Sequence, residues 1–215
     1  MLTAVLWDFG GVILSSPFEA FNHFEASTGL PRDFIRTVNA TNPHANAWAL
    51  LERNDISPAE FDSAFAADSR ALGREVRGAD VLALLAGEVR PRMVAALDTL
   101  KAAGYKLACL TNNVVADDAD EPTAAGSGRR GAIAEIMRRF DVIVESSKAG
   151  VRKPEPRFYE IACEQLGVEP SECVFLDDLG INLKPAAAMG MRTIKVGDPD
   201  LALAELSAML DLSIP

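Results

Sequence analysis

The sequence has few of the residues on which several catalytic and binding mechanisms depend. Histidine occurs only twice, at His23 and His44, so a mechanism built on a histidine cluster has little material. The three cysteines, Cys109, Cys163 and Cys173, are scattered through apolar segments without a CxxC spacing. This usage indicates reduced packing residues in a cytoplasmic protein rather than disulfides or a cysteine metal site.

Positive charge and long apolar runs are also scarce. The net charge of −10 repels phosphate backbones and anionic lipid surfaces, so we expect neither nucleic acid nor a membrane as a partner. No stretch approaches the ~20 apolar residues that span a bilayer. The start MLTAVLWD has no basic leader and its apolar run ends at Asp8, which is unlike a secretory signal. We expect a cytoplasmic monomer or homodimer that acts on a small molecule.

The sequence does contain short apolar runs that end in polar residues. Its 215 residues are 49% hydrophobic and 24% charged, which is the balance of a globular enzyme. Runs this short and this continuously apolar are typical of strands buried on both faces, as in a parallel sheet covered by helices. The predicted strands are Ala4–Trp7, Lys106–Leu110, Val142–Val144, Val174–Leu176 and Thr193–Val196.

Segments with helical periodicity lie between these runs, over residues 91–103, 156–166 and 181–189. A proline or a polar residue opens each segment, and a glycine follows it where a left-handed residue ends a helix. The repeated order of helix, glycine and strand predicts βα units with right-handed crossovers. The predicted fold class is therefore α/β, with a Rossmann-like parallel sheet as its core.

Residues 16–88 do not follow this repeated order of helix, glycine and strand. They contain helix-like segments at 58–72 and 79–85 but no convincing strand. Because they are inserted directly after the first strand, we expect them to form an α-helical cap over the strand ends. The predicted division is an α/β core of residues 1–15 and 89–215 with a helical cap of residues 16–88.

A second irregular stretch covers residues 117–131, with the sequence DDADEPTAAGSGRRG. It is polar and rich in small residues. This composition predicts a mobile loop.

Polar residues gather where the predicted strands end. The carboxyl ends of parallel strands share one edge of the sheet, and ligands of such folds bind at that edge. Carboxylate oxygens, with waters and a substrate phosphate, are the ligands that Mg²⁺ prefers. A carboxylate can also attack phosphorus, while a lysine and the metal neutralise the phosphoryl oxygens. The residues at this edge are Asp8, Thr111, Asn112, Ser147, Asp177 and Asp178, with Arg152 and Lys153 after the third run.

Each of these residues also has an ordinary explanation. Asp8 before two glycines suits a turn or a helix cap, and Thr111 suits a loop. Lys153 before a proline suits a solvated surface, and Asp177 suits a helix N-terminus. These explanations would have to coincide at the ends of successive strands, so we favour a phosphoryl-transfer site.

Four segments resemble, in order, the four motifs of the haloacid dehalogenase superfamily. VLWDFGGVIL resembles motif one, LACLTNN motif two, SSKAGVRKPEPRFY motif three, and VFLDDLGINLKPAAAMGMRTIKV motif four. The segments KPEP and FLDDLGINLKPA are similar to those of the N-terminal phosphatase domain of soluble epoxide hydrolase. The segment GMRTIKVGDPDLALAEL is similar to the domain fused to some acyl-CoA dehydrogenases.

The resemblance implies an Mg²⁺-dependent phosphohydrolase, a phosphomonoesterase that acts on a small phosphorylated metabolite through an aspartyl-phosphate. It assigns the nucleophile to Asp8. It implies that Thr111 and Asn112 hold the transferring phosphoryl group. Lys153 would bridge the phosphate and Asp8.

The resemblance also implies a set of metal ligands. Asp8 and the carbonyl of Gly10 would bind Mg²⁺ at the end of the first strand. Asp177 and Asp178 would anchor the ion from the fourth predicted strand, with Asn182 nearby.

Gly10 departs from the pattern of the superfamily. Its phosphatases usually carry a second aspartate two positions after the nucleophile, which protonates the leaving oxygen and later activates water. Such acid–base help is worth typically about 10²–10⁴-fold. The chain could be a phosphatase for good leaving groups, such as sugar-1-phosphates, aryl phosphates or acyl phosphates. It could also obtain an acid from the cap or through water.

Two alternatives of other kinds stay open. One is a phosphate- or ligand-binding regulatory module with little turnover. The other is a 2-haloacid dehalogenase, which requires a cationic and apolar halide pocket and no Mg²⁺. The pair Asp177 and Asp178 argues against the dehalogenase.

Overall fold

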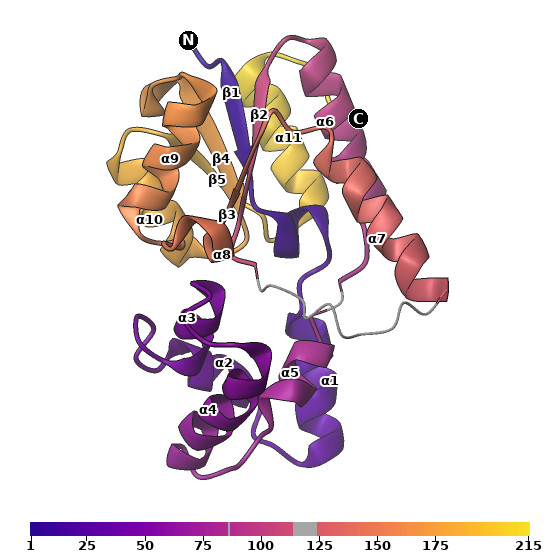
Figure 1. Ribbon diagram of the computed structural model, residues 1–215. Coiled ribbons are helices and arrows are strands. Elements are labelled where there is room, and N and C mark those ends of the chain that lie inside the picture. Colours follow the sequence, from indigo (N-terminus) through magenta and orange to yellow (C-terminus); the bar gives the residue numbers. More distant parts are fainter. Residues whose placement is uncertain (86, 114–123) are drawn as a thin grey trace.

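The computed structural model describes residues 1–85, 87–113 and 124–215, and within them a parallel sheet of five strands forms the centre (Figure 1). The strand order is β3-β2-β1-β4-β5. The order reverses between β1 and β4, which is where open α/β sheets bind ligands. The strands are β1 (Ala4–Trp7), β2 (Lys106–Thr111), β3 (Val142–Glu145), β4 (Cys173–Asp177) and β5 (Arg192–Lys195).

Helices cover both faces of this sheet, which confirms the predicted α/β class. One face packs against α6 (Pro91–Ala102), α7 (Ala124–Met137) and α11 (Pro199–Leu210). The other face packs against α9 (Pro156–Leu166) and α10 (Gly180–Ala188). Each predicted strand lies within one residue of the observed one at both ends.

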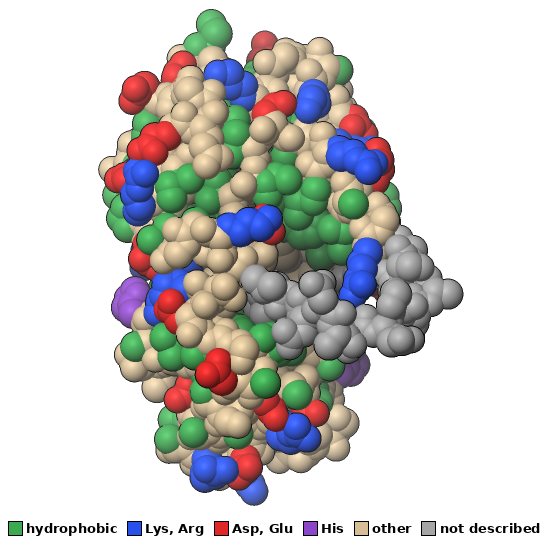
Figure 2. All heavy atoms as spheres, viewed as in Figure 1, with side chains coloured by type: hydrophobic (Ala, Val, Ile, Leu, Met, Phe, Trp, Pro, Cys, Tyr) green, Lys and Arg blue, Asp and Glu red, His purple; other side chains and the backbone are tan. Residues whose placement is uncertain are grey.

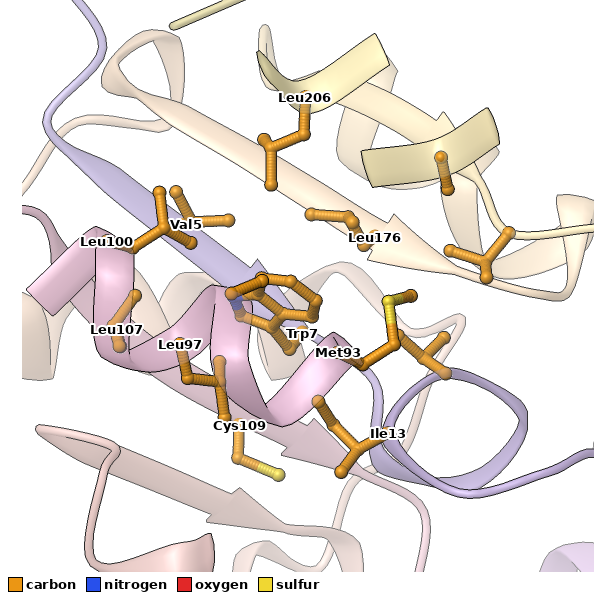
Figure 3. Close-up of a cluster of buried hydrophobic side chains, with 14 of the residues drawn as sticks. Val5, Trp7, Ile13, Met93, Leu97, Leu100, Leu107, Cys109, Leu176 and Leu206 are labelled. Carbon is orange, nitrogen blue, oxygen red and sulfur yellow. The ribbon is translucent and has the colours of Figure 1, made fainter. Parts of the chain in front are cut away.

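The side chains of β1 show why its apolar run is continuous. Val5 and Trp7 belong to the core cluster on one face, whereas Ala4 and Leu6 belong to the cluster on the other. All four are fully buried, because successive residues of a strand point to opposite faces. Figure 3 shows Trp7 packed among side chains of α6 and the neighbouring strands.

Helices α1–α5 form a second unit with its own core. Their buried residues include Phe61 and Phe65, whose ring centroids lie 5.3 Å apart, with Trp48 against Phe61 at 5.5 Å. We propose that this unit is the cap and that the chain divides near residues 15 and 88. The helices are α1 (Phe18–Thr28), α2 (Phe34–Ala40), α3 (Ala47–Glu52), α4 (Pro58–Ala71) and α5 (Gly78–Ala83).

The chain enters and leaves this unit at one place. Leu14 and Val89 form an antiparallel bridge, and the Ser15 N–H donates to the carbonyl of Glu88 at 2.7 Å. On the face shown in Figure 2, acidic and basic side chains are interspersed.

The loop predicted over residues 117–131 is wrong in its second half. Residues 124–131 begin α7, and residues 117–123 lie outside the described part of the chain. The helix is held by its later turns, where Ile136 is buried in the core and Ile133 and Met137 pack against it. Tertiary packing of this apolar stripe overrides the weak helix propensity of the glycines that precede it.

Candidate active site

Asp8, Asp177 and Asp178 come together at the carboxyl edge of the sheet. Asp177 ends β4, Asp178 follows it, and Asp8 follows β1, which pairs directly with β4. One carboxylate oxygen from each residue lies within 4.8 Å of the others. The edge therefore concentrates three negative charges, two of which, on Asp8 and Asp177, are buried.

Lys153 is the cation among them. Its Nζ lies 2.8 Å from Oδ1 of Asp8 and 2.8 Å from Oδ2 of Asp177, and the residue is 1% exposed. A lysine is rarely buried unless it is paired. Lys153 thus bridges the ends of β1 and β4, and the solvated surface position considered for it is wrong.

The pKa values of this cluster indicate a surplus of negative charge. Burial alone would lower the pKa of Lys153, but Asp177 and Asp8 outweigh burial and raise it. Burial raises the pKa of Asp8 well above its usual value, against the opposing effect of Lys153. Burial and the charge of Asp177 raise the pKa of Asp178 to about 6. Without a further cation, the site therefore resists full ionisation.

The donor set fits a hard divalent cation. Three carboxylates against one ammonium leave two negative charges in excess. Mg²⁺ takes oxygen ligands and is usually bound by one or two carboxylates with waters and phosphate. A divalent cation would offset this excess, and the clustered carboxylate oxygens are the ligand type that it prefers.

Asp177, the last residue of β4, is oriented by the start of α10, with support from α9. Its carboxylate accepts hydrogen bonds from Nδ2 of Asn182 at 3.0 and 3.1 Å and from the N–H of Leu179 at 2.8 Å. The Tyr159 hydroxyl donates to the carbonyl of Asn182 at 2.7 Å. Asn182, expected only to lie near the metal ligands, therefore fixes the orientation of Asp177.

A tight turn (η1, Phe9–Ile13) follows Asp8. The Phe9 N–H donates to Oδ1 of Asp8 at 2.6 Å and fixes that side chain. Gly11 has a φ of 79°, and a Cβ there would overlap the carboxylate of Asp178. Gly10 is different: its φ of −72° and ψ of 131° suit any residue, and a Cβ would meet nothing within 4 Å.

Thr111 and Asn112 lie at the end of β2, as predicted. Thr111 is its last residue and is buried. Nδ2 of Asn112 donates to the carbonyl of Lys153 at 3.0 Å, and the Lys153 N–H donates to Oδ1 of Asn112 at 2.9 Å. This reciprocal pair ties the β2 end to the segment that carries the lysine.

Sequence reasoning missed two residues that reach this edge from the range 16–88. Oγ of Ser16 donates to Oδ2 of Asp178 at 3.4 Å, and Oε2 of Glu52 accepts from Nδ2 of Asn112 at 3.4 Å. Glu52 also pairs with Arg152. No local pattern marks either residue, because each contact depends on how the cap docks.

A family comparison agrees with this geometry. The haloacid dehalogenase-like hydrolase family matches residues 2–190. The chain belongs to this family. It is accordingly a hydrolase, and the resemblance of its motifs to the haloacid dehalogenase superfamily is confirmed.

Curated relatives match almost the whole chain. Acyl-CoA dehydrogenase family member 10 of Mus musculus is 31% identical over 212 residues, which are 96% of this chain and 19% of that protein. Bifunctional epoxide hydrolase 2 of Mus musculus is 31% identical over 225 residues, 100% of this chain and 40% of that protein. This chain therefore spans less than half of either relative. Phosphatase MT3486 of Mycobacterium tuberculosis is 31% identical over 204 residues, 91% of this chain and 87% of that protein.

Solved structures share the fold. A haloacid dehalogenase family enzyme from Bacteroides thetaiotaomicron, in complex with magnesium and inorganic phosphate, has a TM-score of 0.59 at 20% identity, over 92% of this chain and 96% of that one. L-2-haloacid dehalogenase from Xanthobacter autotrophicus has a TM-score of 0.60 at 20% identity, over 99% of this chain and 85% of that one. Both likenesses concern the fold alone. Within the described residues, no helix is long and apolar enough to cross a membrane.

Proposed function

We propose that this family member is an Mg²⁺-dependent phosphomonoesterase that acts on a small phosphorylated metabolite through an aspartyl-phosphate on Asp8. The observation that carries the proposal is the buried Lys153, held at 2.8 Å from both Asp8 and Asp177 beside a third carboxylate. This arrangement concentrates a nucleophile, a phosphate-binding cation and a metal-ligand set at one sheet edge. The phosphatase relative and the magnesium- and phosphate-bound structure support it.

Asp8, Asp177 and Asp178, with the carbonyl of Gly10, would hold the metal. When bound, Mg²⁺ would offset the excess negative charge and withdraw charge from the phosphoryl oxygens. Lys153 would neutralise another phosphoryl oxygen while its contact with Asp8 keeps that carboxylate aligned. Asn182 and the Leu179 N–H hold Asp177 in its ligand orientation.

Asp8 would attack the phosphorus atom in line with the leaving oxygen. The new Asp8 oxygen–phosphorus bond forms as the bond from phosphorus to the leaving oxygen breaks, and water then hydrolyses the acyl phosphate. The Phe9 N–H holds Oδ1 of Asp8 with Lys153, which leaves Oδ2 as the attacking atom. Thr111, buried at the end of the neighbouring strand, would bind a phosphoryl oxygen.

The position two residues after Asp8 is Gly10, so the chain carries no aspartic acid at that position to protonate the leaving oxygen. We therefore propose that good leaving groups are favoured, such as those of sugar-1-phosphates, aryl phosphates and acyl phosphates. The rate of the chemical step should fall steeply as the pKa of the leaving alcohol rises.

The test is hydrolysis of p-nitrophenyl phosphate with and without Mg²⁺, alongside Asp8→Asn. We expect activity only with the metal, and a loss on the order of 10⁴-fold or more in the variant. Metal-independent turnover, or an Asp8→Asn variant that matches the wild type, would contradict the mechanism. A series of aryl and alkyl phosphates then measures the leaving-group dependence.

A phosphate-binding module with little turnover is the second candidate, and Gly10 is the observation that favours it. Binding of BeF₃⁻ with Mg²⁺ and no turnover of any phosphate ester would support that function. Dehalogenation is disfavoured, because three clustered carboxylates repel a halide.

A further inference from the structure

Glu52, the last residue of α3, is a buried carboxylate at the junction of the cap and the core. It is 6% exposed, and α3 faces α8 (Ser146–Ala149) across the junction (Figure 1). A glutamate is almost never fully buried without a partner. The partners of Glu52 lie in the core, on segments 60 and 100 residues away in the sequence.

Arg152 is the charged partner. Nη2 of Arg152 lies 2.6 Å from Oε2 of Glu52, with both side chains largely buried. Nη1 of the same arginine donates to the carbonyl of Pro43 at 3.1 Å. One core guanidinium thus binds the cap at two points.

Asn112 is the second partner of Glu52, and it belongs to the candidate site. Its amide donates to Oε2 of Glu52 at 3.4 Å and to the Lys153 carbonyl at 3.0 Å, while its oxygen accepts from the Lys153 N–H at 2.9 Å. Both amide protons and one oxygen lone pair are therefore engaged within the protein. Hydrogen bonds therefore connect the Glu52 carboxylate through Asn112 to the backbone of Lys153, whose ammonium contacts Asp8.

An adjacent ion pair provides a matched comparison. Nη1 of Arg53 lies 3.9 Å from Oε1 of Glu155 across the same junction. Oε1 of Glu155 also accepts from the Arg152 N–H at 3.3 Å, whereas the hydrogen bonds and ion pairs of Arg53 itself reach no predicted site residue. A partly exposed ion pair of this length contributes little to stability. Residues 52 and 53 therefore both contact the core, and of these two only Glu52 contacts a predicted site residue.

We propose that Glu52 is a positioning residue, which holds Asn112 and Arg152 in place when the cap is docked and so couples cap docking to phosphoryl transfer. The inference rests on the proposed phosphatase function. A buried ion pair adds little net stability compared with an apolar contact of the same size. Glu52 contributes orientation instead, because its carboxylate fixes the rotamer of the Asn112 amide beside Lys153.

The first experiment measures kcat and KM for p-nitrophenyl phosphate with Mg²⁺ in Glu52→Ala, Glu52→Gln and Arg53→Ala. We expect Glu52→Ala to lower kcat by about 10- to 100-fold with little change in KM, as loss of an outer-shell hydrogen bond does at metal sites. Glu52→Gln keeps an acceptor oxygen and should recover part of that loss. Arg53→Ala removes the neighbouring pair and should keep the wild-type kcat.

A double-mutant cycle tests the path through Asn112. If Glu52 acts through that amide, Glu52→Ala should add no further loss in kcat to Asn112→Ala. Additive losses, or a Glu52→Ala variant with wild-type kcat and a lowered Tm, would overturn the proposal. If Glu52→Ala does not fold, the comparison of Glu52→Gln with Arg53→Ala decides the question, and equal kcat values overturn it.

A second readout does not depend on turnover. Trp48 lies one turn before Glu52 on α3, and the other tryptophan, Trp7, is fully buried in the core. Because Glu52 is a neighbour of Trp48 on the same helix, the change is made on the core side of the pair: we expect Arg152→Ala to shift the emission of Trp48, and Arg53→Ala to leave it unchanged. If the wild type hydrolyses no substrate, the proposed function fails while this comparison still tests the docking contact: an unshifted Arg152→Ala spectrum overturns it.

Discussion

The carboxyl edge of the sheet and the interior of the cap bury polar groups in different ways. In the cap, the carboxylate of Glu25 accepts from the N–H groups of Asp33 and Ile35 at 2.8 and 2.9 Å, at the start of α2. The Asn46 side chain likewise bonds only backbone groups: its amide nitrogen donates to two carbonyls, and its oxygen accepts from the N–H of Ala49. At the sheet edge, carboxylates lie beside other carboxylates, and a single lysine offsets part of their charge.

The buried polar groups of the cap support the fold, whereas those at the sheet edge are suited to bind a ligand. Backbone N–H groups that donate to a buried carboxylate stabilise its ionised form. A cluster with excess charge raises the pKa of its members and lowers stability until a cation binds. Glu52 is the exception in the cap, because its partners are core side chains of the site.

The largest expected effect comes from Lys153→Met, which removes the cation from the sheet edge. The change leaves Asp8 and Asp177 buried without their partner, so it should lower the free energy of unfolding by about 3–5 kcal/mol and abolish turnover. Urea denaturation and the phosphatase assay measure the two effects. Lys195→Met, at an exposed position on β5, should stay within about 0.5 kcal/mol of the wild type. A stable Lys153→Met variant would mean that the edge carries no excess charge.

Gly10→Asp adds an acid to the same edge without steric cost, since a Cβ there meets nothing within 4 Å. We expect kcat/KM for phosphates with poor leaving groups to rise, by up to about 10²–10⁴-fold. The control is Gly10→Asn, which has the same shape and no acidic proton. If a folded Gly10→Asp variant gains nothing over Gly10→Asn, another acid already protonates the leaving group.

Glu25→Gln tests the other side of the comparison. It replaces one of two charge-assisted hydrogen bonds with a donor–donor contact, so we expect a loss of about 2 kcal/mol in the free energy of unfolding. Turnover measured well below Tm should match that of the wild type. Glu205→Gln, at an exposed position, is the control for loss of a charge. A drop in kcat for Glu25→Gln would place the interior of the cap within the catalytic machinery.

The pH dependence of Mg²⁺ binding is the smallest expected effect. The pKa of Asp178 is raised from 3.8 to about 6 in the folded protein, so its ionisation lowers the stability of the metal-free protein as pH rises through this window. Mg²⁺ must displace that proton, and its affinity should fall about tenfold per pH unit below about 6. Calorimetry between pH 5 and 7.5 measures the affinity. Asp178→Asn should bind more weakly and with a shallower pH dependence, since Asp8 still titrates there, and a flat wild-type profile would contradict the assignment.

Much of the core could be predicted from the sequence, because local and global signals agree there. The central strands β1, β2 and β4 are apolar runs that end at a polar residue, and the parallel arrangement brings those ends to one edge. Asp8, Thr111 and Asp177 could therefore be assigned to one site without knowledge of any contact. The start of α7 could not, because its first turns are rich in glycine and its anchor, Ile136, lies later.

The cap and its contacts were harder to predict. Helices α2 and α3 are seven and six residues long, which is too short for a clear helical period. Glu52 and Ser16 approach the site only after the cap has docked, so no spacing in the chain marks them. The pairing of Lys153 with Asp177 as well as Asp8 is likewise a property of the folded edge.

The bridge between Leu14 and Val89 allows the cap segment to vary during evolution. The two connections to the cap lie side by side, joined by the hydrogen bond between Ser15 and Glu88. A segment whose ends meet in this way can be lengthened, exchanged or removed while the sheet and its edge stay intact. The cap then behaves as a replaceable module, and a short linker from Ser15 to Glu88 should yield a minimal capless enzyme.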